Sequence, residues 1–255
     1  MQPLVRNLLL VTLLALAPGL ARANTLPLST TLEALLEDDG SIQVADKLFT
    51  NFTYFSTGDM PSAVGVNVIP ITDVDGNYGL RFQGAFVDLA SSPGGSDALI
   101  TYDVEIVDGY FDDGLNYFIV DAHIMGNPTL LSGFGSISVV DTFLPQFGPE
   151  ARMTIFDDEV AGTKFVDWVD FDVPVKKLSV QKDILAIALL EDSEPGAATL
   201  SFVDQTYSQI PEPTTLILFG LGLGGLASQG RRRSHDKRSF ASPNASCEAQ
   251  PNRAA

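Results

Sequence analysis

Asp121 and His123 are the two residues whose types and spacing could support acid–base chemistry. They stand two positions apart in residues 117–124, where apolar and polar residues alternate as in a β-strand, so both side chains should point to one face. A carboxylate beside a histidine can orient the ring for proton transfer or metal binding. The sequence contains no nucleophile-elbow, zinc-protease or phosphate-loop motif to accompany this pair. We therefore expect His123 to be a packed or surface residue, and we assign no catalytic residue.

Two acidic turns contain the oxygen-bearing side chains that Ca²⁺ prefers. The first turn departs from the EF-hand pattern, which requires Gly where Tyr78 stands and Glu where Gly84 stands. Because Asp-Gly between apolar runs is a strong turn signal, we expect ordinary turns and no cofactor, with Ca²⁺ binding as the alternative. The weak Ca²⁺ candidates are Asp73, Asp75 and Asn77 in the first turn and Asp108, Asp112 and Asp113 in the second.

Trp168 is the only tryptophan of the chain. Together with Tyr102 or Tyr110 it could stack on sugar rings. A single tryptophan in an all-β domain usually packs in the core, because its large ring buries much apolar surface. We therefore expect Trp168 to be a core residue and keep sugar stacking as the alternative.

Short apolar runs bounded by Gly, Pro, Asp or Asn recur through residues 41–203 and predict around ten strands. One short helix is expected over residues 30–37, with Thr30 as its N-cap and Glu33 completing a capping box. No longer helical stripe appears, and no linker divides this region. Residues 91–96 are only of loop length, and the strands that flank them are spaced as in a hairpin. The sequence thus predicts an all-β fold: a single β-sandwich domain over residues 24–210, jelly-roll-like or Ig-like.

The charge of this region is strongly negative. Residues 24–210 contain 7 Lys and Arg against 29 Asp and Glu, a net charge of −22. Such a surface repels polyanions, so a nucleic-acid partner held through its phosphates is excluded. The only cysteine, Cys247, lies beyond this region, so the domain cannot be held together by disulfides and must depend on its core.

The first 23 residues have the three parts of a secretory signal peptide. Arg6 supplies the positive charge, residues 8–17 form a short apolar core, and Ala21 and Ala23 occupy the small-residue positions before the cleavage site. The apolar run is too short for a comfortable membrane span. We expect cleavage after Ala23.

The C-terminal part has a second tripartite pattern. Pro211, Glu212 and Pro213 precede an apolar, glycine-containing run at residues 214–227, and Arg231, Arg232 and Arg233 follow. The run is shorter than the about 20 residues of a stable transmembrane helix. The arginines favour the cytoplasmic side of the membrane. An ordinary C-terminal anchor is the alternative interpretation.

These three parts, in this order, resemble the PEP-CTERM sorting signal of Gram-negative, biofilm-forming bacteria. The resemblance covers residues 211–233 and implies processing by an exosortase, a membrane-embedded enzyme, near the Pro-Glu-Pro motif. Residues 234–255 extend further than such signals usually do, and we expect them to be a disordered cytoplasmic tail. Residues 40–52 and 198–207 also resemble a group of PEP-CTERM proteins that has no assigned activity.

Three functional hypotheses follow. The first is a non-enzymatic surface or matrix protein, exported, transiently anchored in the inner membrane, processed by an exosortase and associated with exopolysaccharide in a biofilm. The second is a carbohydrate-binding module assisted by Ca²⁺. The third and least favoured is a secreted polysaccharide hydrolase with a carboxylate pair, since the sequence singles out no such pair among its many carboxylates.

Overall fold

Long β-strands dominate the part of the chain that the structure describes. The structure is a computed structural model, and it describes residues 28–37, 40–111, 113, 115–131, 134–144, 151–190 and 196–212. The signal peptide with Ala21 and Ala23, the sorting segment from Pro213 through Arg231, Arg232 and Arg233, and the tail 234–255 lie outside these residues. Among the described residues, no helix is long and apolar enough to cross a membrane.

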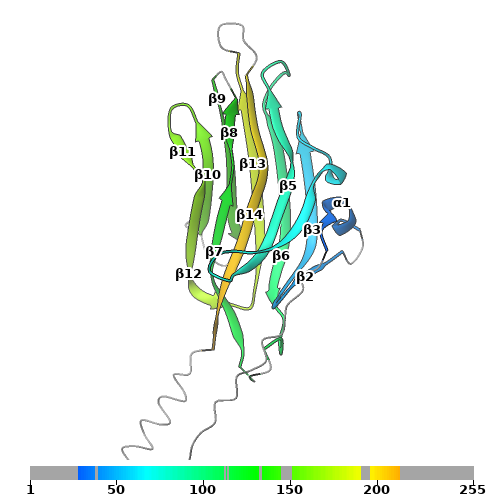
Figure 1. Cartoon of the computed structure of the whole chain (residues 1–255), viewed down its shortest axis with the longest axis vertical. Helices are drawn as coiled ribbons and strands as arrows, with labels where there is room; N and C mark the ends of the chain where they lie inside the picture. The colour runs from blue at the N-terminus through cyan, green and yellow to red at the C-terminus, as the bar shows by residue number, and fades with distance from the viewer. Residues whose placement is uncertain are drawn as a thin grey trace, which may run out of the picture.

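The strands form two antiparallel sheets, which we call sheet A and sheet B (Figure 1). Sheet A has the order β1-β4-β5-β14-β7-β12, with β8 also pairing with β14. Its strands are β1 (Thr30–Thr31), β4 (Asn67–Thr72), β5 (Tyr78–Leu89), β7 (Tyr117–Gly126), β8 (Thr129–Leu131), β12 (Val166–Val175) and β14 (Ala197–Pro211).

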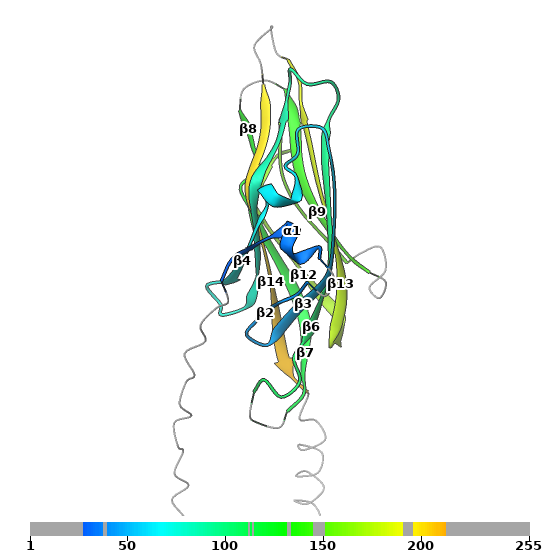
Figure 2. The same ribbon diagram turned by 90° about the vertical axis from the view of Figure 1, so that its right-hand side faces the viewer.

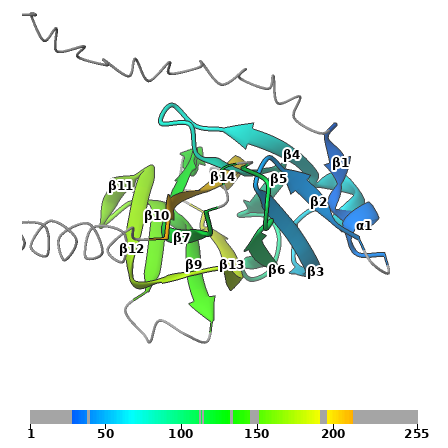
Figure 3. The same ribbon diagram turned by 90° about the horizontal axis from the view of Figure 1, so that it is seen from below.

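Sheet B has the order β11-β10-β9-β13-β6-β3-β2. Its strands are β2 (Ile42–Val44), β3 (Lys47–Thr57), β6 (Ser96–Ile106), β9 (Gly135–Leu144), β10 (Arg152–Asp158), β11 (Gly162–Lys164) and β13 (Lys177–Ala188). A short helix, α1 (Leu32–Leu35), and a 3₁₀ turn, η1 (Ala63–Gly65), accompany the sheets. Figure 3 shows α1 beside β2 and β3, at the opposite side of the molecule from β10 and β11.

The path of the chain between the sheets is that of a jelly roll. Strands β5, β7, β12 and β14 lie in sheet A, whereas β6, β9, β10 and β13 lie in sheet B, so the chain crosses repeatedly from one sheet to the other. The last strand, β14, returns between β5 and β7 at the centre of sheet A. Eight strands that form two interlocked Greek keys give this arrangement. The all-β sandwich is confirmed, and its topology is the jelly-roll alternative.

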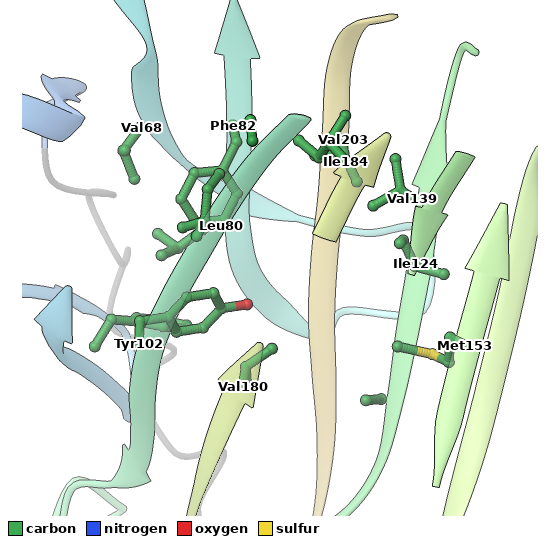
Figure 4. Packing of buried hydrophobic residues seen from close by; sticks show 14 of the residues in the cluster. Val68, Leu80, Phe82, Tyr102, Ile124, Val139, Met153, Val180, Ile184 and Val203 are labelled. Carbon is green, nitrogen blue, oxygen red and sulfur yellow. The ribbon is translucent and has the colours of Figure 1, made fainter. Parts of the chain in front are cut away.

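The core lies between the inner faces of the two sheets. Strand β6 alternates strictly between buried and half-buried residues, as expected of a strand with one face on the core. Side chains from both sheets meet there (Figure 4), including Leu80, Phe82, Ile124 and Val203 from sheet A and Tyr102, Val139, Met153, Val180 and Ile184 from sheet B. The sheets are also joined by a buried hydrogen bond of 2.8 Å between the hydroxyl groups of Tyr102 and Tyr207.

Two lysines are buried in this core, each beside a buried aspartate. Lys182 Nζ lies 2.7 Å from both carboxylate oxygens of Asp141 and donates to Gln205 Oε1 at 3.1 Å. Burial lowers the pKa of Lys182 and raises that of Asp141, because each loses the water that stabilises its charge, although the opposite charge counteracts both shifts. No solvent reaches either side chain, so the pair holds β13 to β9 from within the core.

The second buried pair lies where β2 turns into β3. Lys47 Nζ contacts Asp46 Oδ2 at 2.8 Å and donates to Gln209 Oε1 of β14 at 2.6 Å. Burial lowers the pKa of Lys47, against the attraction of Asp46. Asp46 Oδ1 is buried without a hydrogen-bond partner among the described residues. Lys47 therefore joins sheet B to the end of the last strand of sheet A.

Three local predictions differ from the structure. The helix is shorter than expected and its N-cap is Thr31, whose hydroxyl accepts a hydrogen bond from the backbone N–H of Ala34 at 3.3 Å, so the capping box with Thr30 and Glu33 is wrong. The described residues form fourteen strands rather than around ten, because several strands of two or three residues carry no periodic signal. The connection after β5 leads to the other sheet, whereas its spacing resembled that of a hairpin.

Candidate functional site

The outer face of sheet A carries a groove over the edge strand β12 and the three strands next to it, β7, β14 and β5. Cross-strand pairing places side chains in rows that run across β12, β7, β14 and β5. One row contains Val166, Met125, Asp204 and Arg81, and the next contains Trp168, His123, Thr206 and Gly79. A cavity of about 430 Å³ that is open to solvent is lined by the turn between β4 and β5 and by six residues of these rows: Arg81, His123, Met125, Val166, Asp204 and Thr206.

Gly79 allows β5 to lie close against β14 beneath this groove. A Cβ atom at this position would meet the backbone oxygen of Gln205 at 1.8 Å, which no side chain can accommodate. The absence of a side chain therefore serves the close approach of the two strands.

Arg81 and Asp204 form the fixed polar group of the groove. Arg81 Nε lies 2.6 Å from Asp204 Oδ1, and its Nη2 donates to Oδ2 at 2.8 Å, a bidentate arrangement. The hydrogen bonds to Asp204 raise the pKa of Arg81, although partial burial opposes them. The guanidinium carbon also lies 4.3 Å from the ring centre of Phe202, which holds the plane of the side chain in place.

The first acidic turn forms the rim of the groove and uses its own carboxylate. Asp73 accepts hydrogen bonds from the backbone N–H groups of Asp75 and Asn77 and from the side chains of Asn77 and Thr206. Burial alone would raise the pKa of Asp73, but these hydrogen bonds outweigh it and lower the pKa below its usual value. The segment connects β4 to β5 as a hairpin, as the Asp-Gly signal predicts.

The second acidic turn, also predicted as a weak Ca²⁺ candidate, lies in the connection between β6 and β7. Asp108 pairs with Lys176 at 2.7 Å, and Asp113 accepts a hydrogen bond from the Tyr117 hydroxyl at 2.6 Å, while Asp112 lies outside the described residues. In the described part of the chain, no three acidic, histidine or cysteine side chains gather closely enough to hold a metal ion. The Ca²⁺ site stays a prediction, and the structure shows the carboxylates of Asp73, Asp108 and Asp113 engaged by protein groups.

Asp121 and His123 lie on the same outer face, as the alternation of their strand predicts. His123 Nε2 is 3.0 Å from Asp121 Oδ1, and the same carboxylate oxygen accepts hydrogen bonds from the backbone N–H and the hydroxyl of Ser208. Asp121 therefore fixes the ring of His123 at the wall of the groove. A fixed imidazole there can donate to or accept from a bound polar ligand.

The prediction that Trp168 packs in the core is wrong. Its side chain is 64% exposed, because β12 is the edge strand of sheet A and turns this residue to the outer face beside His123. Tyr102, in contrast, is buried in the core, and Tyr110 packs edge-on against Phe111 in the loop after β6. The three aromatic residues thus do not form one platform, and Trp168 is the one of them that pairs with a groove residue, His123.

The sorting segment begins as a continuation of β14. Pro211, the last residue of the strand, pairs with Tyr117 of β7. Glu212 then donates its backbone N–H to the carbonyl oxygen of Asn116 at 2.6 Å, and its carboxylate accepts a hydrogen bond from the Asn116 side chain at 3.0 Å. Figure 2 shows the end of β14 beside β7 at one tip of the sandwich. No linker separates the central strand from the motif.

Residues 209–233 match the family model of the PEP-CTERM protein-sorting motif, which confirms the resemblance of this segment. No curated protein is significantly similar to the chain in sequence.

Two solved structures are weakly similar to this chain. The enzymatically active domain of tailspike protein 4 of Bacteriophage CBA120 has 14% identity and a TM-score of 0.24, over 62% of this chain and 19% of that one. TmCBM61, solved in complex with β-1,4-galactotriose, has 12% identity and a TM-score of 0.23, over 62% of this chain and 88% of that one. Likenesses this weak carry no argument about a ligand or an activity.

Proposed function

We propose that this chain, which carries an exosortase sorting motif and is therefore an exported protein anchored transiently in the membrane, is a non-enzymatic surface or matrix protein. The observation that carries the proposal is the direct continuity of β14 with the motif. Because β14 is central to sheet A, the jelly roll is the part that sorting delivers. The association with exopolysaccharide of a biofilm, and a Gram-negative source, belong to this proposal.

The proposal is tested by the intact mass of the mature protein from two hosts, one with and one without the exosortase. We expect the segment beyond the Pro-Glu-Pro motif to be lost only where the enzyme is present. An unchanged C-terminus in both hosts would mean that residues 214–227 are a permanent anchor. An envelope and biofilm unaffected by deletion of the gene would count against the matrix role.

A second candidate function, binding of carbohydrate, is favoured by exposed Trp168, which pairs with the groove residue His123. An exposed aromatic face that pairs with fixed His123, on the same sheet face as the fixed guanidinium of Arg81 three strands away, suits a sugar, which has an apolar face and a hydroxyl rim. The carboxylates of Asp73, Asp75 and Asp204 around the cavity disfavour polyanions, so we expect a neutral glycan.

Replacing Trp168 with alanine should weaken such binding by about thirtyfold, since truncating an aromatic anchor typically costs about 2 kcal/mol. Glycan arrays read with and without a chelator measure the effect and test the assistance by Ca²⁺. Phe55→Ala is the matched control, because Phe55 is equally exposed but belongs to sheet B. Silence of the wild type on every glycan would exclude this function, and turnover of a polysaccharide with a bell-shaped pH profile would favour the hydrolase.

A further inference from the structure

The last residues of β14 differ in how firmly they are bound to the rest of the sandwich. Gln209 accepts a hydrogen bond from buried Lys47, and Ser208 bonds to Asp121. The next residues, Ile210, Pro211 and Glu212, are exposed. Opening the strand as far as Ile210 breaks the pairing of Ile210 and Pro211 with β7 and the exposed contacts of Glu212, but no contact of a buried charge. Opening it beyond Gln209 leaves a buried ammonium group without one of its two partners.

Asn116 makes the contacts that close the exposed end. Its carbonyl oxygen accepts from the backbone N–H of Glu212 at 2.6 Å, and its side chain donates to the Glu212 carboxylate at 3.0 Å. One residue thus engages both the backbone and the side chain of the central residue of the Pro-Glu-Pro motif. The β7 residue that follows, Tyr117, pairs with Pro211 and continues the sheet up to this point.

We propose that the contact of Asn116 with Glu212 is a latch that the membrane-embedded sorting enzyme must open, and that Gln209 is the point beyond which the strand stays closed. The inference rests on the proposed function. An enzyme that reads Glu212 needs the carboxylate and the backbone N–H that Asn116 occupies. The residues that can leave the sheet at little cost are Ile210, Pro211 and Glu212, and these present the motif to the enzyme.

The latch predicts the rate of processing. When opening and closing are fast, cleavage follows the equilibrium fraction of the open form. Loss of the Asn116 side-chain hydrogen bond should raise the open fraction about fivefold, because a fivefold change in an equilibrium corresponds to the free energy that one ordinary hydrogen bond contributes. Asn116→Ala should therefore be processed about fivefold faster than the wild type. Asn116→Asp should also be faster, because its carboxylate would repel that of Glu212.

The experiment is a pulse-chase of the full chain in an exosortase-bearing host, together with amide hydrogen exchange of the full chain from a host without the enzyme. In Asn116→Ala, the Glu212 amide should exchange about fivefold faster while the Tyr207 amide stays protected. Asn127→Ala is the control at the other end of β14, since the Asn127 side chain donates to Ser201 and accepts from the backbone N–H groups of Ser201 and Phe202. This variant should leave processing unchanged.

The outcomes separate this inference from the function on which it rests. A wild-type chain that is never processed contradicts the proposed function. A processed wild type with an Asn116→Ala rate within twofold of it overturns the latch, as does an unchanged exchange rate at Glu212. Faster processing of Asn127→Ala to the same extent would also overturn it, because general loosening of the sandwich would then explain the effect.

Discussion

Replacing Lys182 with methionine should lower the free energy of unfolding by about 3–5 kcal/mol, since removing one partner of a buried ion pair leaves an uncompensated charge. Methionine fills most of the space of the lysine stem but offers no donor to Asp141 or Gln205. Asp141 would then be a carboxylate out of contact with solvent. Denaturant titration at pH 7 measures the loss.

The loss should shrink as the pH falls. Burial already raises the pKa of Asp141, and without the Lys182 charge that opposes it the pKa in the folded variant rises further. A carboxyl group whose folded pKa lies above its unfolded value favours folding below the unfolded pKa, and this contribution is lost as the pH rises through the folded pKa. Between pH 7 and pH 5 the variant should recover up to about 2.7 kcal/mol relative to the wild type.

Two further variants test whether the unpaired charge of Asp141 causes the loss of stability. The double replacement Lys182→Met with Asp141→Leu removes both charges and should restore most of the stability, because apolar residues often substitute for a buried pair at no net cost. Lys164→Met removes a pair with Asp167 that solvent reaches and should cost less than about 1 kcal/mol. A Lys182→Met variant as stable as Lys164→Met, with no dependence on pH, would contradict the prediction.

The fold was largely predictable because its strands alternate. Strand β6 shows why: every second residue from Ser96 to Ile106 is buried, and the sequence carries the same period. The sheet to which each strand belongs was not predictable, since a loop that crosses between sheets has the same length and composition as a hairpin. The buried positions of Lys47 and Lys182 were also missed, because a lysine in a strand signals a solvent-facing residue until its partner is known.

The candidate site was predictable only in part. The shared face of Asp121 and His123 follows from their spacing, and the structure confirms it. Arg81 and Asp204 were missed because they are 123 residues apart in the chain and meet only where β5 pairs with β14. Trp168 was misplaced because position in the sheet, at the edge strand, decides its exposure. Asn116 carries no signal in sequence at all, since its role depends on where β14 ends.

Replacing Lys47 with methionine should cost a similar amount, about 3–5 kcal/mol, but its effect should be concentrated at the end of β14. Lys47 is the group that ties Gln209 to sheet B, and its removal leaves Asp46 buried without a cation and the Gln209 side chain without its donor. Hydrogen exchange should therefore increase most at Ser208 and Gln209. The matched control is Lys176→Met, whose pair with Asp108 is exposed and worth less than about 1 kcal/mol.

The Lys47 variant also shows how far from its C-terminal end β14 can open. If buried Lys47 fixes Gln209, then Lys47→Met should open the strand upstream of Ile210, which Asn116→Ala should not do. Exchange at the amides of Ser208 and Gln209 that increases in Lys47→Met but stays slow in Asn116→Ala would show that the two contacts act in series. Equal exchange in both variants would mean that the end of β14 opens as one unit, and that the domain sets no fixed limit on how far the strand opens ahead of its sorting motif.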